Sequence, residues 1–278
     1  MEINWYPGHM YKTLGDLKKL VNVIDFGMII LDARIPKTSL KDDLLAIFME
    51  KPLLVLFNKC DLADQNKLSA TISNLKNKGI YSLKINAQNG LNITKIKDMV
   101  ETFILKEKIT KASQKGINLK PYKTMIVGIP NSGKSSLVNR LTKQKKVIVK
   151  NMPGTTKNIS WLNAGDFLIL DTPGLLWPKL SNDEQLYLAY TGAIPKHIIV
   201  PEELSYNLVG YLISNYSDEF FNYYKIEKTF DINEIFNQIA KKSGFLLKQG
   251  AIDYHRLGNK ILNDFTLNKF GGISFETI

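Results

Sequence analysis

One eight-residue segment constrains the fold more than any other. Residues 128–135 read Gly-Ile-Pro-Asn-Ser-Gly-Lys-Ser, which fits the phosphate-loop pattern G-x-x-x-x-G-K-[ST]. This pattern needs a strand before it and a helix after it, and here the apolar run 125–128 precedes a helical pattern over 135–142. The glycines let backbone N–H groups turn toward phosphate oxygens, and the helix start adds a positive dipole end. The segment predicts a phosphate-binding loop; a tight strand–helix turn without a ligand is the alternative.

The rest of the first two thirds alternates between apolar runs and helical patterns. The predicted buried strands cover 26–31, 53–57, 81–85, 125–128 and 167–170. The predicted helices cover 11–21, 41–49, 66–77, 93–105 and 135–142. Strands of this kind that alternate with helices predict an α/β fold, with a mostly parallel sheet and helices on both of its faces.

The pattern changes near Leu180. No further apolar run follows, and amphipathic helical windows cover 184–191, 202–216, 232–242 and 254–265. We therefore expect a phosphate-loop domain over 1–179, with an N-terminal segment 1–22, and an all-α domain over 180–278. The lysine-rich stretch 106–123 is expected to be an exposed connection.

The charge is unevenly distributed. The chain has 278 residues and a formal net charge of +11. The first 180 residues hold 28 basic and 14 acidic side chains, whereas residues 181–278 are net −3. This surplus indicates a polyanionic partner such as nucleic acid, with a solvated lysine-rich surface as the alternative.

Other features narrow the setting. Cys60 is the one cysteine, so the sequence excludes an intrachain disulfide framework and predicts no disulfide-linked partner. No apolar run approaches the ~20 residues that a membrane helix needs. The N-terminal residues do not read as a targeting signal. We expect a cytoplasmic protein without a membrane partner.

A second motif suits the metal that accompanies nucleotide phosphates. Asp171-Thr-Pro-Gly174 follows a predicted strand, and Pro153-Gly-Thr-Thr156 lies between it and the phosphate loop. Asp171 and Ser135 are predicted to bind Mg²⁺, and the Gly174 N–H to reach the γ phosphate. By analogy with GTPases, Thr156 completes the metal shell, with Thr155 as the alternative.

A third motif points to guanine. Asn58-Lys-Cys-Asp61 ends a predicted strand, and the Asp61 carboxylate suits the N1–H and N2 amino groups of guanine, which adenine lacks. The backbone N–H of Ala87 in Asn86-Ala87-Gln88 is predicted to meet guanine O6. The predicted nucleotide-binding residues are Asn58, Lys59, Asp61, Asn86, Ala87, Asn131, Ser132, Gly133, Lys134, Ser135, Ser136 and Gly174.

The order of these motifs is unusual. In conventional GTPases the phosphate loop comes first, whereas here the guanine motifs at 58 and 86 precede it. Every strand of a parallel sheet delivers its following loop to the same edge, so cutting the chain elsewhere and rejoining the old termini leaves the site intact. The stretch 106–123 is the predicted rejoining link. The cut falls just after Gly174, so the segment behind it runs directly into the helical domain.

This order resembles that of the circularly permuted GTPases. Trp5-Tyr-Pro-Gly-His-Met10 is similar to the start of the YlqF/RbgA branch, the ribosome biogenesis GTPases A. Leu188–Ile194, Gly250–Asp253 and the region up to Phe275 are similar to the tail of that branch. One departure is Asn86, where many relatives have serine, which puts the role of this side chain in doubt.

The resemblance implies a function. It implies a GTPase that binds rRNA and precursor particles late in assembly of the large ribosomal subunit and is released on GTP hydrolysis. Two groups of basic side chains are candidates for RNA contact, with a solvated surface as the alternative. They are Lys143, Lys145, Lys146, Lys150 and Lys157 near Thr156, and Lys241, Lys242, Lys248, Arg256, Lys260 and Lys269.

The predicted catalytic residues are Lys134 and His9. Lys134 pairs with the β and γ phosphates. Leu175 stands where conventional GTPases place the glutamine that orients water, so this help has to come from elsewhere. The family pattern points to His9, whose segment the permutation brings near the switch; packing of the N-terminal turn is the alternative role.

Asn131 stands where cation-stimulated GTPases carry asparagine. We expect it to help hold K⁺ beside the phosphates, with loop capping as the alternative. Two other functions remain open at this point. They are a nucleotide-gated RNA-binding module with incidental hydrolysis and a phosphate-loop phosphotransferase that uses ATP.

Overall fold

The computed structural model describes residues 15, 17–48, 51–142, 147–150, 160–170, 172, 174–175 and 180–278, with the backbone alone at 147–150, 160 and 196. These residues form two compact units, a sheet unit built mainly from the chain before residue 179 and a helical unit over Lys179–Ile273. The last five residues, Ser274–Ile278, belong to the sheet unit.

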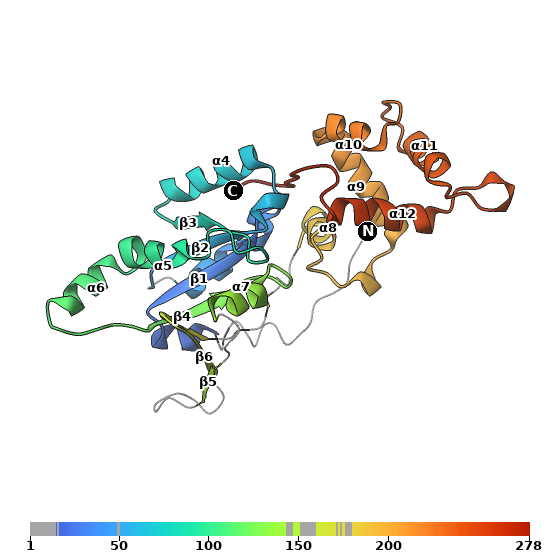
Figure 1. Ribbon diagram of the computed structural model, residues 1–278. Helices are drawn as coiled ribbons and strands as arrows, with labels where there is room; N and C mark the ends of the chain where they lie inside the picture. The colour runs from blue at the N-terminus through green and yellow to red at the C-terminus, as the bar shows by residue number, and fades with distance from the viewer. Residues whose placement is uncertain are drawn as a thin grey trace. The chain divides into compact units, whose positions relative to one another are not determined.

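A seven-stranded sheet forms the centre of the first unit, with the strand order β3-β2-β1-β4-β7-β6-β5 (Figure 1). The strands are β1 (Phe26–Asp32), β2 (Leu53–Asn58), β3 (Tyr81–Lys84), β4 (Tyr122–Val127), β5 (Val147–Lys150), β6 (Ser160–Ala164) and β7 (Phe167–Leu170). β1 pairs in parallel with β2 and β4, β2 with β3, and β4 with β7. β6 runs antiparallel to both β5 and β7. The predicted α/β fold with a mostly parallel sheet is confirmed.

Helices and short turns connect these strands. They are η1 (Val21–Val23), α2 (Pro36–Ser39), α3 (Asp42–Ile47), η2 (Cys60–Leu62), α4 (Gln65–Asn77), α5 (Lys95–Met99), η3 (Val100–Ile104), α6 (Lys106–Ser113) and α7 (Lys134–Leu141). The helix predicted over 93–105 consists of α5 and the π-helical turn η3. The stretch 106–123 is largely exposed and joins η3 to β4, as predicted for a connection, but its first part forms α6, which was not predicted. In α6 only Ala112 is buried, so the sequence carries no apolar stripe to indicate a helix.

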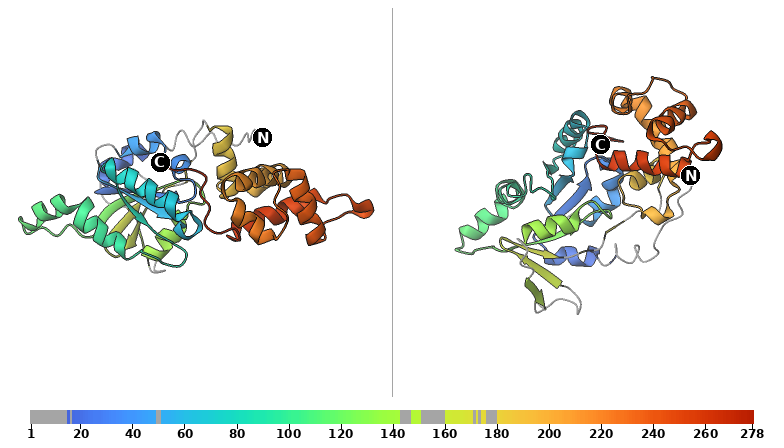
Figure 2. Two further views of the ribbon diagram at one scale, coloured as in Figure 1. Left: turned by 90° about the horizontal axis from the view of Figure 1, so that it is seen from above. Right: turned by 45° about the vertical axis from the view of Figure 1, so that its right-hand side comes forward.

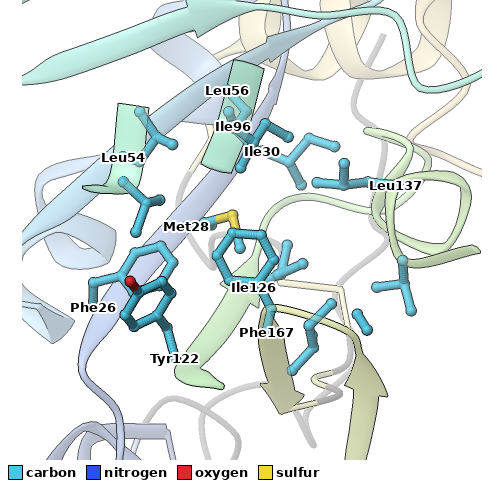
Figure 3. Packing of buried hydrophobic residues seen from close by; sticks show 14 of the residues in the cluster. Phe26, Met28, Ile30, Leu54, Leu56, Ile96, Tyr122, Ile126, Leu137 and Phe167 are labelled. Carbon is cyan, nitrogen blue, oxygen red and sulfur yellow. The ribbon is translucent and has the colours of Figure 1, made fainter. Parts of the chain in front are cut away.

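The core lies on both faces of the sheet. All seven residues of β1 are buried, which requires cover on each side. On one face, Ile96 of α5 and Leu137 of α7 pack over Ile30 (Figure 3). Farther along this face the ring of Phe167 lies 6.0 Å from that of Phe26 and 6.3 Å from that of Tyr122, measured between centroids. This packing holds β1, β4 and β7 together below their carboxyl ends, where the predicted site lies.

The second unit consists of helices (Figure 2). They are α8 (Asn182–Tyr190), η4 (Lys196–Ile198), α9 (Pro201–Asn215), α10 (Ser217–Tyr224), α11 (Ile232–Ser243), η5 (Lys248–Gly250) and α12 (Tyr254–Thr266). A capping box between Ser181 and Glu184 starts α8, and Pro201 at the first turn starts α9. α9 and α12 pack against each other. The predicted all-α C-terminal region is confirmed, with α10 in addition.

The last five residues bind the sheet unit through backbone and side chains. The Ser274 hydroxyl accepts from the Asp64 N–H at 3.0 Å, and the Phe275 N–H donates to the Arg34 carbonyl at 2.9 Å. The carboxylate of Glu276 accepts from the Thr38 hydroxyl at 2.9 Å. The sequence analysis assigned these residues to the helical domain. Their polar contacts are instead with the sheet unit, around α2 and α4.

Candidate nucleotide-binding site

The phosphate loop joins β4 to α7, as its sequence predicts. Gly133 precedes α7 with a φ of +98°, a backbone conformation that favours glycine. A Cβ at this position would lie 2.0 Å from Nδ2 of Asn58, which donates to the Ser132 carbonyl at 2.7 Å. Glycine is therefore required here both by the backbone angle and by the close approach of Asn58. The loop ends at the N-terminus of α7, where backbone N–H groups attract anions.

The predicted phosphate and metal ligands lie at this turn. Lys134 is the first residue of α7, and the next two, Ser135 and Ser136, are exposed. The Ser132 hydroxyl is buried and has no hydrogen-bond partner among the described residues. Asn131 has a positive φ of 57°. Serine hydroxyl and carboxylate oxygens are ligands that suit Mg²⁺, so the exposed Ser135 fits the predicted metal site.

The segment around the D-x-x-G motif contacts the phosphate loop. The Thr172 hydroxyl donates to the Ile126 carbonyl of β4 at 2.5 Å. The Leu175 N–H donates to the Gly128 carbonyl at 3.0 Å, and a Cβ at Gly174 would lie 3.2 Å from Pro130. Leu175 is buried. Gly174 and Leu175 therefore lie against the phosphate loop, and Thr172 is bonded to the strand just before it.

Three predicted residues lie outside the described residues: His9, Thr156 and Asp171. Their roles stay predictions. The same holds for Lys143, Lys145, Lys146 and Lys157 among the candidate RNA-binding side chains, and for the side chain of Lys150.

Asn58 connects the phosphate loop to the predicted base loop. It ends β2 and is buried, and its Oδ1 accepts from the Ala87 N–H at 2.8 Å while its Nδ2 donates to Ser132. One side chain thus joins residues 58, 87 and 132. The Ala87 N–H, which the sequence predicts for guanine O6, donates to Asn58 in this structure.

The side chain of Asn86, whose role the sequence leaves open, makes three hydrogen bonds in this structure. Its Nδ2 donates to Oδ1 of Asp61 at 2.6 Å, and its own Oδ1 accepts from the N–H groups of Gln88 at 2.8 Å and Asn89 at 3.0 Å. The structure therefore brings together the carboxylate predicted to bind N1–H and N2 and the loop predicted to meet O6.

A buried ion cluster supports the guanine motif from below. Asp32 ends β1, and its carboxylate accepts two hydrogen bonds from the Arg34 side chain, at 2.9 and 2.8 Å, and one from Nζ of Lys59 at 2.9 Å. Burial alone would raise the pKa of Asp32, but the charges of Arg34 and Lys59 outweigh it and hold this pKa well below its usual range. Lys59 has a positive φ of 57°, and this ion pair fixes its side chain.

The sequence analysis missed three residues of the site: Asp32, Arg34 and Arg140. A charged residue directly after a continuous apolar run is a signal that could have found Asp32. Arg140, on α7, donates through Nε to the Ala87 carbonyl at 3.2 Å and through a terminal nitrogen to the Gln88 carbonyl. It has no recognisable motif around it, so only the fold reveals the contact.

Two kinds of feature are absent from the described residues, a membrane-spanning helix and a metal-binding cluster of side chains. None of their helices is long and apolar enough to cross a membrane. They contain no cluster of three or more His, Cys, Asp or Glu side chains able to hold a metal ion.

Comparison with known proteins identifies the family. A family model described as 50S ribosome-binding GTPase matches residues 123–239, beginning in β4 just before the phosphate loop. The guanine motif at 58–61 lies ahead of the matched residues, in keeping with the permuted order.

Relatives that match almost the whole chain are named ribosome biogenesis GTPase A. Ribosome biogenesis GTPase A of Bacillus licheniformis is 37% identical over 99% of this chain and 98% of its own length. The probable ribosome biogenesis GTPase A of Mycoplasma genitalium is 30% identical over 99% of this chain and 97% of its own. A solved structure of GDP-bound YlqF, at 23% identity, matches with a TM-score of 0.63 over 94% of this chain and 98% of that one, which supports the permuted fold.

These matches decide between the enzyme classes left open by the sequence. A phosphate-loop protein with a guanine motif and GTPase relatives over its full length hydrolyses GTP, generally with Mg²⁺, and is not an ATP phosphotransferase. The chain belongs to the ribosome biogenesis GTPase A family and is a GTPase of ribosome biogenesis with ribosome-related partners.

Proposed function

We propose that this GTPase acts as a switch in late assembly of the large ribosomal subunit. In this proposal the GTP-bound chain binds rRNA in a precursor particle, and hydrolysis releases it. The observation that carries the proposal is the hydrogen bond of Leu175 to the phosphate loop at Gly128 and the close approach of Gly174 to Pro130 in that loop. Residue 175 lies only a few residues before the helical unit, so a change at the γ phosphate is passed to that unit along the chain.

The base end of the site selects the nucleotide. In the proposal, Asp61 accepts from N1–H and N2 of guanine, and the loop that contains Ala87 donates to O6. The hydrogen bond from Asn86 to Asp61 supports this assignment, because it orients the carboxylate before the base arrives. Lys59 keeps the guanine motif in place through Asp32.

The phosphate end performs the chemistry. Lys134 and the N–H groups at the start of α7 hold the β and γ phosphates, and the Gly174 N–H meets the γ phosphate. Ser135, Thr156 and Asp171 would hold Mg²⁺, which neutralises charge on the phosphates when bound. His9 orients the attacking water, a task that the apolar side chain of Leu175 cannot perform. Asn131 is proposed to hold K⁺ beside the same phosphates.

The charge of the chain supports an RNA partner. The surplus of basic side chains in the first 180 residues gives long-range attraction to phosphate backbones. In this proposal, lysines near Thr156 join the contact only in the GTP-bound state, so the affinity for a particle is higher with GTP than with GDP.

Sedimentation with ribosomal particles tests the proposal. The chain is mixed with precursors of the large subunit in the presence of GDP or of a GTP analogue that cannot be hydrolysed, with small subunits as the control. We expect co-sedimentation with the large-subunit precursor in the analogue and its loss in GDP. Equal binding in both nucleotides, or equal binding to both subunits, would overturn the proposal. If a hydrolysis-dead variant still completes its cellular task, the chain is instead a nucleotide-gated binding module.

A further inference from the structure

Arg140 stands out chemically in this chain. It is one of three arginines among 37 basic side chains, and it lies on α7, six residues after Lys134. A guanidinium is a planar fork that can donate to two acceptors at once, whereas an ammonium is a point charge. Arg140 uses that fork on two consecutive carbonyls, those of Ala87 and Gln88.

The two peptide groups that carry these carbonyls are held from both sides. In a trans peptide the C=O of one residue and the N–H of the next point in opposite directions. Arg140 takes the carbonyls of Ala87 and Gln88, and Oδ1 of Asn86 takes the N–H groups of Gln88 and Asn89. Ala87 itself is held at both polar backbone atoms, by Asn58 at its N–H and by Arg140 at its C=O. The conformation of the loop is therefore fixed by its own Asn86 side chain and by side chains from two other parts of the site, Asn58 and Arg140.

The same hydrogen-bond network includes Asp61, whose carboxylate is proposed to bind N1–H and the N2 amino group of guanine. Asn86 donates to Asp61 through Nδ2 while its Oδ1 holds the loop. Guanine presents an acceptor at O6 beside donors at N1 and N2, so a site for it needs donors and a carboxylate at a fixed separation. Arg140 and Asn86 together set that separation.

We propose that Arg140 is a positioning residue for guanine recognition, which orients the O6-binding loop from the phosphate-loop helix. This role rests on the proposed base site: Arg140 is the residue that makes the part of that site facing O6 selective for guanine. The N–H groups of these two peptides donate to Oδ1 of Asn86, so Arg140 acts by fixing the shape of the loop. A 6-amino group, as in adenine, is itself a donor and does not match a site that donates to O6. Because Arg140 and Lys134 share one helix, the base and the phosphates are read by a single rigid element.

Three nucleotides distinguish this role from a general structural one. GDP has O6, N1–H and the 2-amino group, 6-thio-GDP has a weakly accepting sulfur in place of O6, and IDP lacks only the 2-amino group. Their affinities are measured by competition with a fluorescent guanine nucleotide for the full chain and for Arg140→Ala, Arg140→Lys and Asn139→Ala. Asn139 is the matched control, because it is the exposed neighbour of Arg140 on α7.

We expect Arg140→Ala to lower the affinity for GDP by about tenfold, which is the order of one lost charge-assisted hydrogen bond. The affinity for 6-thio-GDP should fall by less than about threefold. The preference for GDP over 6-thio-GDP then collapses, while the preference for GDP over IDP, which Asp61 sets, stays the same. Arg140→Lys resembles Arg140→Ala, because the ammonium does not reproduce the planar fork that reaches both carbonyls, and Asn139→Ala resembles the unaltered chain.

An equal loss for all three nucleotides, or no loss for GDP, would overturn the role in O6 recognition. A failure of the base site itself would be visible without any substitution, because the unaltered chain would then bind ADP as tightly as GDP.

Discussion

The two ends of the nucleotide site are built in different ways. At the base end the polar groups are side chains from distant segments, and each is held by another, as Asp61 is by Asn86. At the phosphate end most of the proposed donors belong to one continuous segment, residues 128–135, whose shape is set by glycine at Gly133 and by one bridge from Asn58.

This difference indicates a division of labour. In the proposed site, GDP and GTP share the same base, so the base end selects guanine in either phosphate state. The γ phosphate is proposed to meet the phosphate end, which Leu175 connects to the segment leading to the helical unit. In this proposal the base end decides which nucleotide binds, and the phosphate end decides what its hydrolysis changes.

Asp61→Asn breaks the base end alone. An amide cannot accept from both N1–H and N2 of guanine, and sites built on such polar pairs discriminate strongly, so we expect GDP affinity to fall by about 1,000-fold or more. Affinity for xanthosine diphosphate, which has an oxygen at position 2, should rise. Competition binding measures both, and unchanged GDP affinity would refute the assignment of Asp61.

Asp32→Asn removes the anion beneath the guanine motif. Arg34 then loses the buried carboxylate with which it pairs at 2.8 Å, which costs about 3 kcal/mol in the free energy of unfolding. The folded-state pKa of Asp32 lies below its usual value, so its stabilisation is complete above about pH 4 and is lost as the pH falls toward that folded-state pKa. Urea unfolding at several pH values should show a less stable variant at pH 7 with a shallower loss in acid. Equal stability of the two proteins at pH 7 would contradict the role of the cluster.

His9→Ala changes the phosphate end alone. Loss of a group that orients water should lower turnover by about tenfold or more, while GTP affinity stays within about threefold. Single-turnover hydrolysis, measured for the free chain and with precursor particles, tests this. Normal turnover in both settings would leave His9 with a packing role only.

Charge reversal at Lys145 and Lys146 tests whether the lysines near Thr156 contact RNA. Each phosphate contact contributes about 0.9 to the slope of log affinity against log salt, so loss of two contacts should flatten that slope by about 2. GTP affinity of the free chain should not change, because neither lysine belongs to a nucleotide motif. A salt slope identical to that of the unaltered chain would exclude these two residues from the interface.

The smallest expected effect concerns the monovalent ion. If Asn131 helps hold K⁺ beside the phosphates, hydrolysis should be a few-fold faster in K⁺ than in Na⁺ at equal ionic strength. Equal rates in the two salts would leave Asn131 as a loop cap, which its positive φ already suits.

The sequence predicted the parts of the fold that local patterns determine. β1, β2 and β7 are continuous apolar runs because parallel strands in the middle of a sheet are buried on both faces. β5 and β6 were missed: β6, which reads Ser-Trp-Leu-Asn-Ala, has no continuous apolar run, and β5 is a four-residue strand that pairs only with β6 at the antiparallel end of the sheet. α6 was missed because its residues are charged and exposed.

The site shows the same limit. The phosphate loop and the guanine motif can be recognised in the sequence, because the backbone geometry of the one and the base-binding carboxylate of the other require fixed residue types at fixed spacing. The partners of these residues cannot be recognised in the sequence. Arg140 donates a hydrogen bond to a loop 53 residues earlier in the chain, and Glu276 accepts one from Thr38 across 238 residues. Such contacts follow from the topology of the sheet, and no local pattern records them.

The central claim is that the γ phosphate controls the affinity for the particle. Thermodynamic linkage then requires the particle to change nucleotide preference by the same factor. The decisive measurement is the ratio of the dissociation constants of GDP and a non-hydrolysable GTP analogue, determined with and without saturating large-subunit precursor. The account predicts that the particle shifts this ratio toward the analogue by the factor by which the analogue strengthens particle binding. An unchanged ratio would contradict a nucleotide switch.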